Sequence, residues 1–434
     1  MKALNEWRIT QMRVTPIAFR DPPLLNAVGI HEPYALRSIV ELETNDGLVG
    51  IAETYGDEGM LKALAAAREL IEGFSPFDLN GMDERVKHGV KATKSAGFEM
   101  NLAPGSHGAK NAAKVMAAFE GAMLDLIGQR LGAPVCDVLG GAVRDSVPYS
   151  AYLFFKYAEH IEKPYGKNAA PDAWGEGISP EQIVAQARRM RELYGFGSIK
   201  LKGGVFDPAH EVACMVALSK AFPGVPLRLD PNANWTLETS IKHAPALNDV
   251  LEYYEDPTPT LDGMNELAKH TTLPLATNMV VTSFEELKQS VRYPGRGPVQ
   301  VVLSDHHYWG GLRATQTLAR ICETFGLGVS MHSNSHLAPS LIAMTHLAAA
   351  VPNLSYACDT HYPWQEEEVS AEGRVKFVNG SVVVPRTPGL GVTLDREAVR
   401  TLHEQYLSCS IRTRNDTAEM KKYDPSFTGK SPRY

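Results

Sequence analysis

The sequence predicts an α/β protein, a modified (β/α)7β barrel of the TIM type with an α+β capping domain. After residue 147, short apolar runs that end in a charged or amide residue recur about every 25 residues, with helical segments between them, as in a closed barrel. The residues before them indicate a hairpin followed by helices. Hydrophobic residues make up 44% of the chain and charged residues 21%, a composition that can bury large cores.

The N-terminal region, residues 1–142, is expected to form most of the capping domain. Residues 37–44 alternate partly between apolar and polar side chains, an Asn-Asp-Gly turn follows at 45–47, and residues 48–52 run back. This pattern predicts an antiparallel hairpin. The stretch 20–33 contains three prolines and little periodicity, which predicts a loop, and we expect it to close over the functional site.

The rest of the capping domain is predicted to be helical. From about residue 60 to 140 the apolar residues follow a helical pattern, most clearly in the Ala- and Leu-rich run 113–131. The C-terminal segment 385–434 contains another helical pattern at 395–407. We expect this segment to pack back on the capping domain.

The barrel is predicted to span residues 143–384. Its helices have clear start signals, because Ser179 and Pro180 supply an N-cap with proline in the first turn, and Ser283 with Glu286 fits a capping box. Parallel barrel strands all end at one rim, where active sites lie. The eight predicted strands are 147–155, 198–202, 226–230, 251–255, 273–278, 299–305, 327–332 and 354–361.

Charge and cysteine usage exclude several classes of protein. The net charge of −7 argues against a nucleic-acid partner. No apolar run approaches the ~20 residues that span a bilayer, and the first residues lack a signal-peptide core, so a cytoplasmic location without a membrane partner is expected. The five cysteines form no Cys-x-x-Cys pair, which predicts free thiols. Capped barrels commonly associate symmetrically, so we expect a homo-oligomer, a dimer or larger.

Oxygen-bearing side chains end three successive predicted strands, namely Asp230, Glu255 and Asn278. Each of them alone would fit a helix N-cap or a turn. Hard oxygen ligands from neighbouring strands are what Mg²⁺ requires, and their convergence favours a Mg²⁺ site. Glu255 has a rival ligand in Asp262, which lies in the next loop.

Two lysines share one face of the predicted strand 198–202. Lys200 and Lys202 lie on that face because side chains alternate along a strand. We expect both to point into the polar mouth of the barrel, where a nearby cation can lower a lysine pKa enough for it to act as a base. A structural ion pair is the alternative interpretation.

A histidine and a carboxylate end two later strands. His332 ends the strand 327–332 and Asp305 ends the one before it, so Asp305 is expected to orient the imidazole. A core histidine with one hydrogen bond is the alternative. The metal-ligand strands lie between those of Lys202 and His332, which predicts one base on each side of the substrate. A divalent cation would stabilise the charge formed when a proton leaves the carbon beside a carboxylate.

These residues resemble those of the enolase superfamily, in the subgroup with a Lys-x-Lys pair and a His–Asp dyad, and most closely the glucarate dehydratase family. The resemblance extends from the loop at 26–31 to Arg414. The motifs that carry it are Tyr152-Leu153-Phe154-Phe155, Lys200-Leu201-Lys202-Gly203-Gly204-Val205, Leu229-Asp230-Pro231-Asn232, Glu255-Asp256-Pro257, Ala276-Thr277-Asn278-Met279, His332-Ser333, Asp359-Thr360-His361 and Trp364-Gln365-Glu366.

The resemblance implies a Mg²⁺-dependent dehydratase with Lys202 and His332 as opposed acid/base catalysts. Lys200 would lie beside the substrate carboxylate and Asp305 would pair with His332. The implied reaction is loss of water from a small-molecule diacid, D-glucarate or L-idarate, to give 5-dehydro-4-deoxyglucarate. The implied Mg²⁺ ligands are Asp230, Glu255 and Asn278, and the implied substrate contacts are Asn26, His31, Tyr152, Lys200, Asn232, Ser333, Asn334, His361 and Arg414.

The chain also departs from the family's pattern. The loop after Glu255 is shorter, Asn334 stands where the family has Asp, and the residues after Asp305 differ. A different acid sugar is therefore an open alternative, and so is an epimerase or racemase, which would keep the β-hydroxyl. The family's threonine contact falls within residues 101–107, where Ser106 is the candidate. A metallohydrolase would want a His-x-His motif after the first barrel strand, and a binding protein would have little reason to keep both bases, so both are disfavoured.

Overall fold

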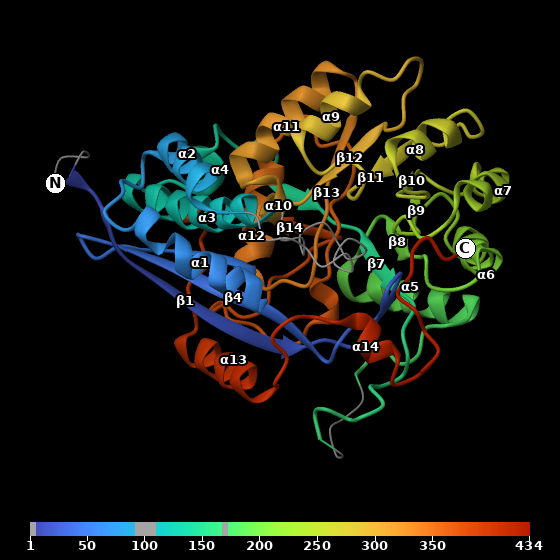
Figure 1. The fold of residues 1–434 in the computed structure, drawn as a ribbon, viewed down its shortest axis with the longest axis horizontal. Helices are drawn as coiled ribbons and strands as arrows, with labels where there is room; N and C mark the ends of the chain where they lie inside the picture. The colour runs from blue at the N-terminus through green and yellow to red at the C-terminus, as the bar shows by residue number, and fades with distance from the viewer. Residues whose placement is uncertain (1–5, 92–109, 167–171) are drawn as a thin grey trace.

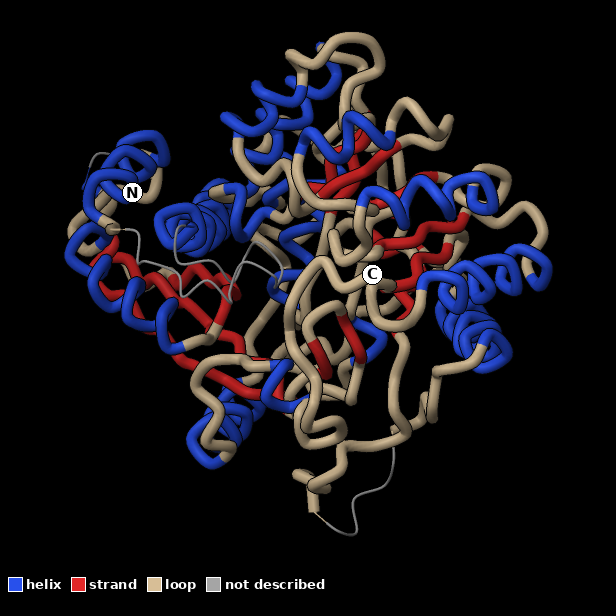
Figure 2. Tube along the Cα trace, turned by 45° about the vertical axis from the view of Figure 1, so that its right-hand side comes forward, coloured by secondary structure: helices blue, strands red, loops and turns tan. Residues whose placement is uncertain are grey.

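The structure, a computed structural model, describes residues 6–91, 110–166 and 172–434 (Figure 1). A barrel of parallel strands lies beside an antiparallel sheet with helices, and the C-terminal segment returns to that sheet (Figures 1 and 2). The predicted fold class, a (β/α)7β barrel with an α+β cap, is confirmed. In the described residues, no helix has both the length and the apolar character needed to cross a membrane.

The cap contains a three-stranded antiparallel sheet in the order β1 (Ile9–Arg20), β4 (Tyr34–Thr44) and β5 (Val49–Tyr55). The predicted hairpin is present as β4 and β5, and the Thr44 amide donates to the Leu48 carbonyl across its turn. The helices of the cap are α1 (Glu58–Ile71), α2 (Leu79–Gly89), α3 (Asn111–Leu131) and α4 (Val135–Val138).

Two features of the N-terminal region differ from the expectation. The long strand β1 was not recognised, because Pro16 interrupts it and its buried residues do not alternate regularly. The predicted loop 20–33 contains a minimal hairpin of β2 (Leu25–Asn26) and β3 (Gly29–Ile30). This hairpin lies over the barrel and not at the periphery, since the Leu25 amide donates to the Phe155 carbonyl at the end of the first barrel strand.

Seven parallel strands form the barrel sheet, and each lies next to its neighbour in sequence. This order is that of a barrel built from successive βα units. The strands are β7 (Ala151–Phe154), β8 (Ile199–Lys202), β9 (Leu227–Asp230), β10 (Tyr253–Glu255), β11 (Leu275–Thr277), β12 (Val301–Ser304) and β13 (Gly328–Met331).

The first and last predicted strands need correction. Pro148 cannot donate a backbone hydrogen bond, and the predicted strand 147–155 is split there into β6 (Ser146–Pro148), which pairs with β14 (Ser381–Val383), and β7. The predicted strand 354–361 is irregular and makes only single bridges. One joins Leu354 to Val329 of β13 and another joins Cys358 to Tyr149, beside β7. The segment thereby connects the two edges of the curled sheet.

The helices around the barrel begin largely where the sequence indicated. Ser179 caps α5 in a full capping box with Gln182. Ser283 caps α9, but the Glu286 carboxylate accepts from the Thr282 amide and not from the amide of the N-cap residue. The helices are α5 (Pro180–Tyr194), α6 (Pro208–Ala221), α7 (Leu237–Leu247), α8 (Leu261–Leu267), α9 (Phe284–Ser290), α10 (His306–Trp309), α11 (Leu312–Thr324), α12 (Ala338–Ala349) and the 3-10 helix η5 (Tyr362–Trp364).

A residue of the capping domain stabilises the N-terminus of the barrel helix α12. Residue Leu337 precedes α12 and has no side chain able to accept a hydrogen bond. The buried carboxylate of Glu53, from strand β5, accepts hydrogen bonds from the amides of Leu337 and Ser340 instead. These amides carry the positive end of the helix dipole, so the carboxylate stabilises the start of α12.

The C-terminal segment packs on the cap and over the barrel. Helix α13 (Arg396–Ser408) lies along β1, where His403 bonds the Pro16 carbonyl and Gln405 donates to the Ala18 carbonyl. Helix α14 (Asp416–Met420) lies against β3. A side chain at Gly29 would place Cβ 2.1 Å from the Asp416 carbonyl oxygen, so this contact requires glycine.

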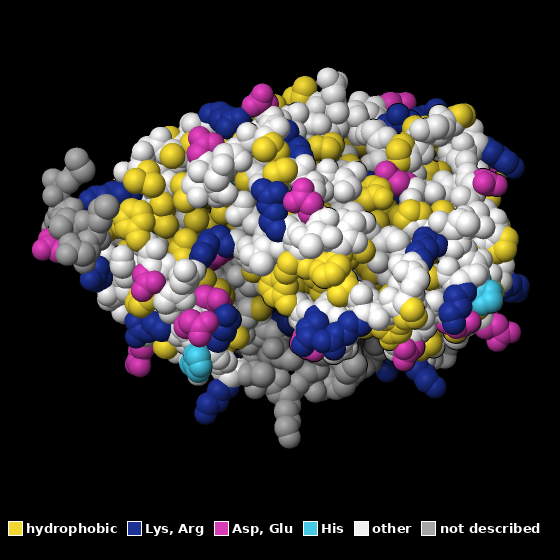
Figure 3. Space-filling model, turned by 90° about the horizontal axis from the view of Figure 1, so that it is seen from above, with side chains coloured by type: hydrophobic (Ala, Val, Ile, Leu, Met, Phe, Trp, Pro, Cys, Tyr) yellow, Lys and Arg dark blue, Asp and Glu magenta, His cyan; other side chains and the backbone are white. Residues whose placement is uncertain are grey.

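Basic and acidic side chains are interspersed over the face shown in Figure 3. On the described part of this face they form no continuous basic stripe of the kind that tracks phosphates. The five cysteines, all within the described residues, are unpaired, and only Cys409 is not fully buried.

Candidate active site

The side chains that end strands β8, β9 and β10 meet in the interior of the barrel. Lys202 pairs in register with Asp230 on the neighbouring strand, and its Nζ lies 2.7 Å from Asp230 Oδ2. Lys200 Nζ lies 2.7 Å from Glu255 Oε1 and 2.7 Å from Asp359 Oδ2. All five side chains are buried. The parallel register thus brings together the lysines and carboxylates that the sequence singled out.

The predicted metal ligands include two buried oxygen atoms with no hydrogen-bond donor. Glu255 Oε2 and Asn278 Oδ1 have no partner among the described residues, although a buried polar atom normally has one. Asp230 completes a set of three hard oxygen donors from adjacent strands. This set fits a divalent cation such as Mg²⁺. The rival ligand Asp262 is exposed and instead accepts a hydrogen bond from Tyr293.

A third carboxylate, Asp256, also lies within this group, since ligand atoms of Asp230, Glu255 and Asp256 are all within 4.8 Å of one another. Its own oxygens are occupied. Oδ1 accepts from the Thr277 hydroxyl at 2.5 Å and Oδ2 accepts from the Asn278 amide at 2.8 Å. Asp256 therefore orients the residue beside it. It was not among the predicted site residues, although it lies in the Glu-Asp-Pro motif.

The two lysines differ in their surroundings. Burial alone would lower the pKa of Lys200, but the nearby carboxylates of Asp359 and Glu255 raise it well above its ordinary value. Lys200 is therefore a fixed cation, and it also lies over the Tyr152 ring at 4.6 Å. Lys202 donates to Asp230 and Asn232 and reaches the cavity. Only Lys202 is thus placed to exchange a proton with a bound molecule.

The predicted dyad is also assembled in the structure. His332 Nδ1 lies 3.3 Å from Asp305 Oδ2, and the side-chain Nδ2 of Asn334 donates to the same oxygen at 3.0 Å. Burial would raise the pKa of Asp305, but its interactions with His307 and His332 outweigh burial and hold this pKa well below its ordinary value. Asp305 is therefore an ionised acceptor that orients the His332 ring.

A cavity of about 330 Å³ lies between the cap and the barrel mouth. Its wall contains Lys202 and His332 together, with most of the predicted substrate contacts. Lys200 and Ser333 are not in the wall. The Ser333 hydroxyl accepts from the His361 backbone amide, so Ser333 positions His361. The predicted contacts in the wall are Asn26, His31, Tyr152, Asn232, Asn334, His361 and Arg414. Ser106 lies outside the described residues.

Three predicted contacts are held by two acidic residues that were not among the predicted site residues. Arg414 donates through Nε and Nη2 to the two oxygens of Asp416, both at 2.6 Å. Asn26 from β2 also donates to Asp416. His31 bonds Asp21 at 3.0 Å. A substrate contact by Arg414 is therefore limited to the rest of its guanidinium, because Asp416 already occupies one edge.

The cap contributes further cavity residues, including Arg37, Tyr55, Asp57, Asn111 and Lys114. None of them was predicted. Polar residues within the apolar pattern of helix α3, such as Lys114, were the available signal. Burial raises the pKa of Asp57 above its ordinary value.

Comparison with known proteins supports one family. Residues 182–398 match the model described as "Enolase C-terminal domain-like". A probable glucarate dehydratase from Streptomyces coelicolor is 51% identical over 433 residues, which cover 98% of this chain and 99% of the relative.

Solved structures agree with this match. An enolase from Pseudomonas fluorescens with bound magnesium, potassium and tartrate is 57% identical, with a TM-score of 0.94, over 99% of this chain and 100% of that one. An enolase from Mycobacterium smegmatis complexed with tartrate is 54% identical, with a TM-score of 0.92, over the whole of both chains.

Proposed function

The chain belongs to the enolase superfamily, and from that premise we propose that it is a Mg²⁺-dependent acid-sugar dehydratase. Its proposed reaction converts D-glucarate or L-idarate to 5-dehydro-4-deoxyglucarate. The observation that carries the proposal is the placement of Lys202 and His332 in the wall of one cavity, beside a buried oxygen set with two unpartnered atoms.

Asp230, Glu255 and Asn278 would hold the cation. Bound there, Mg²⁺ would act as a Lewis acid on the substrate carboxylate and stabilise the negative charge that builds on its oxygens. The buried Lys200 ammonium, fixed by Glu255 and Asp359, would add positive charge at the same end of the substrate.

Lys202 and His332 would carry the protons. One of them takes the proton from the carbon beside the carboxylate, and the configuration of that carbon decides which. The carbon–oxygen bond to the β-hydroxyl then breaks, and a protonated side chain gives its proton to the departing group, so that water leaves. The enol product then becomes the keto acid, because its carbon takes up a proton and its hydroxyl oxygen loses one. Asp305 keeps the His332 ring aimed at the substrate throughout.

A hydroxylated diacid fits the remainder of the cavity. His31, His361 and Arg414 provide donors around it, while Asn232 and Asn334 can bond hydroxyl groups. The 51% identical relative is a probable glucarate dehydratase, and two solved relatives carry tartrate, which is itself a hydroxylated diacid. These similarities support a diacid over a monoacid sugar.

Incubation of the purified protein with a library of acid sugars, with Mg²⁺ or with EDTA, tests the proposal. A keto-acid assay should detect product from D-glucarate or L-idarate only when Mg²⁺ is present. Proton exchange in deuterated water without any keto acid would instead identify an epimerase or racemase. Lys202→Ala and His332→Ala should each lower turnover by about 10²- to 10⁴-fold. Full activity in either variant would contradict the proposed roles.

The expected homo-oligomer and cytoplasmic location belong to the same proposal. Sedimentation of the purified protein would test the first, and fractionation of the source cells the second.

A further inference from the structure

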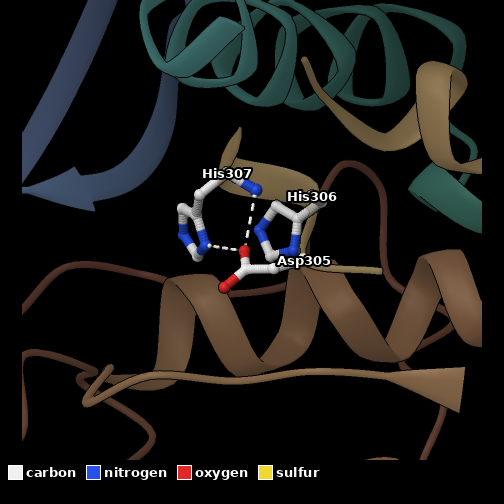
Figure 4. A group of neighbouring side chains, drawn as sticks. All are labelled: Asp305, His306 and His307. Carbon is white, nitrogen blue, oxygen red and sulfur yellow. Dashed lines mark hydrogen bonds and ion pairs between the residues drawn. The ribbon is translucent and has the colours of Figure 1, made fainter. Parts of the chain in front are cut away.

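Asp305 is shared between two histidines. One oxygen, Oδ2, faces His332. The other, Oδ1, accepts from both the backbone amide and the ring of His307, at 2.9 and 2.8 Å (Figure 4). We infer that His307, held by Arg37 from the cap, is a positioning residue that sets which nitrogen of His332 carries the proton. The inference rests on the proposed function of His332 as a base.

Arg37 determines the tautomer of His307. Its Nη2 lies 2.9 Å from His307 Nε2, and both side chains are buried. A guanidinium group has only donors, so Nε2 must present its lone pair. A second ring proton there would also place two cations in contact. The single ring proton of His307 is therefore on Nδ1, which donates to Asp305 Oδ1.

Arg37 is itself fixed by the cap. Its Nε donates to Glu53 at 2.8 Å, and its guanidinium lies over the Tyr55 ring at 4.8 Å. Ser340 from α12 lies 2.6 Å from the same His307 Nε2 and can only donate to it. The cap and α12 thus impose one proton position on His307.

The consequence reaches the dyad. With Oδ1 filled by two donors, Asp305 offers Oδ2 to His332 Nδ1 and to the Asn334 amide. An ionised carboxylate only accepts, so His332 must carry its proton on Nδ1. Nε2, on the other side of the ring, then has the lone pair needed to take a proton from the substrate.

A metal site is the competing explanation of this cluster, because ligand atoms of Asp305, His306 and His307 lie within 4.8 Å of one another. Both ring nitrogens of His307 and both oxygens of Asp305 already have hydrogen-bond partners. Hydrogen bonding therefore accounts for the cluster without an ion.

Two substitutions of His307 separate the bond to Asp305 from the bond to Arg37. Asparagine has an amide NH₂ near the position of Nδ1 and can still donate to Asp305. Glutamine reaches the position of Nε2, where its oxygen can accept from Arg37, but it offers no side-chain donor to Asp305. We expect His307→Gln to lower kcat by about 10- to 100-fold with little change in KM, and His307→Asn to recover most of that loss. Equal losses in both variants, in proportion to a fall in melting temperature, would overturn the inference.

The tautomer can be measured without any activity. Nitrogen-15 NMR of histidine-labelled, Mg²⁺-loaded protein distinguishes Nδ1–H from Nε2–H, and His332→Gln identifies the His332 signals among the 14 histidines. We expect Nδ1–H at His332 in the wild type and a mixture in His307→Gln. His270→Gln, at an exposed position, should leave the His332 signals unchanged.

The two proposals fail in different ways. A proton on Nε2 of His332 in the wild type overturns the inference about His307, whatever the activity. A wild type with the expected tautomer but no keto-acid product overturns only the proposed dehydratase function.

Discussion

Replacement of Asp256 by asparagine should weaken Mg²⁺ binding without touching a ligand. In the wild type, Asp256 accepts from the Thr277 hydroxyl and from the Asn278 amide. Asparagine has the same shape but only one accepting oxygen. If that oxygen faces Asn278, the Thr277 hydroxyl loses its acceptor, and if it faces Thr277, the Asn278 amide meets an NH₂ group. In either orientation one buried donor is left without a partner, so Asn278 is held less firmly.

The expected size follows from that lost bond. A buried donor left without a partner costs about 1 to 3 kcal/mol. Since about 1.4 kcal/mol corresponds to a factor of ten, the part of this energy that orients Asn278 should raise the dissociation constant for Mg²⁺ by about 10- to 100-fold. Calorimetric titration with Mg²⁺ measures the constant directly, and the Mg²⁺ dependence of turnover gives a second value.

The matched control is Asp262→Asn, the same chemical change on an exposed carboxylate in the first turn of α8. It should bind Mg²⁺ like the wild type. Melting curves establish that both variants are folded. A folded Asp256→Asn protein with wild-type Mg²⁺ affinity would refute the assigned role of Asp256.

Three further predictions concern charge, the hairpin over the barrel and pH. Lys200→Met removes the cation shared by Glu255 and Asp359 and should destabilise the metal-free protein by about 3 to 5 kcal/mol. The midpoint of urea unfolding should fall, and Mg²⁺ should partly restore it. An unchanged midpoint would contradict the buried network. Gly29→Ala forces β3 away from the Asp416 carbonyl and should raise KM for the diacid several-fold more than it lowers kcat, whereas Gly47→Ala, in an open turn, should leave KM unchanged. Burial raises the pKa of Glu120 to about 7. The folded state therefore holds the carboxyl proton of Glu120 more tightly than the unfolded state does. The stability contributed by this protonated group is complete below the ordinary glutamate pKa and is lost as pH rises through about 7. Between pH 5 and 8 the wild type should lose roughly 2 to 3 kcal/mol of unfolding free energy through this group, and the Glu120→Gln variant should not. Urea unfolding of both proteins measures the difference, and parallel pH profiles would refute the prediction.

The sequence predicted the parts of the fold that repeat. Strand ends at Lys202, Asp230 and Glu255 recur at a regular spacing, and the parallel register then fixes their proximity. Irregular elements were missed for local reasons. Pro16 disguises β1, Pro148 splits the first predicted barrel strand, and the segment 354–361 joins both edges of the sheet through single bridges.

The contacts between the cap and the barrel could not be predicted. Arg37 and His307 are 270 residues apart, and Asn26 and Asp416 are 390 apart. A single sequence contains no periodicity that connects such positions. Arg414 was expected to contact the substrate, and the Asp416 carboxylate that binds it is recognisable only when the C-terminal segment is folded over the barrel.

The hydrogen bonds from helix α12 to Glu53 of the capping domain have a consequence for protein engineering. Glu53 lies in the cap, but the first turn of α12, which it stabilises, lies in the barrel. Chimeras that exchange caps between relatives should therefore preserve the pairing of residue 53 with the 337–340 turn, and of Arg37 with His307. A crossover placed in the linker near residue 143 would separate both pairs at once. Recombination at that point should yield soluble hybrids only when both parents carry the same residues at these four places.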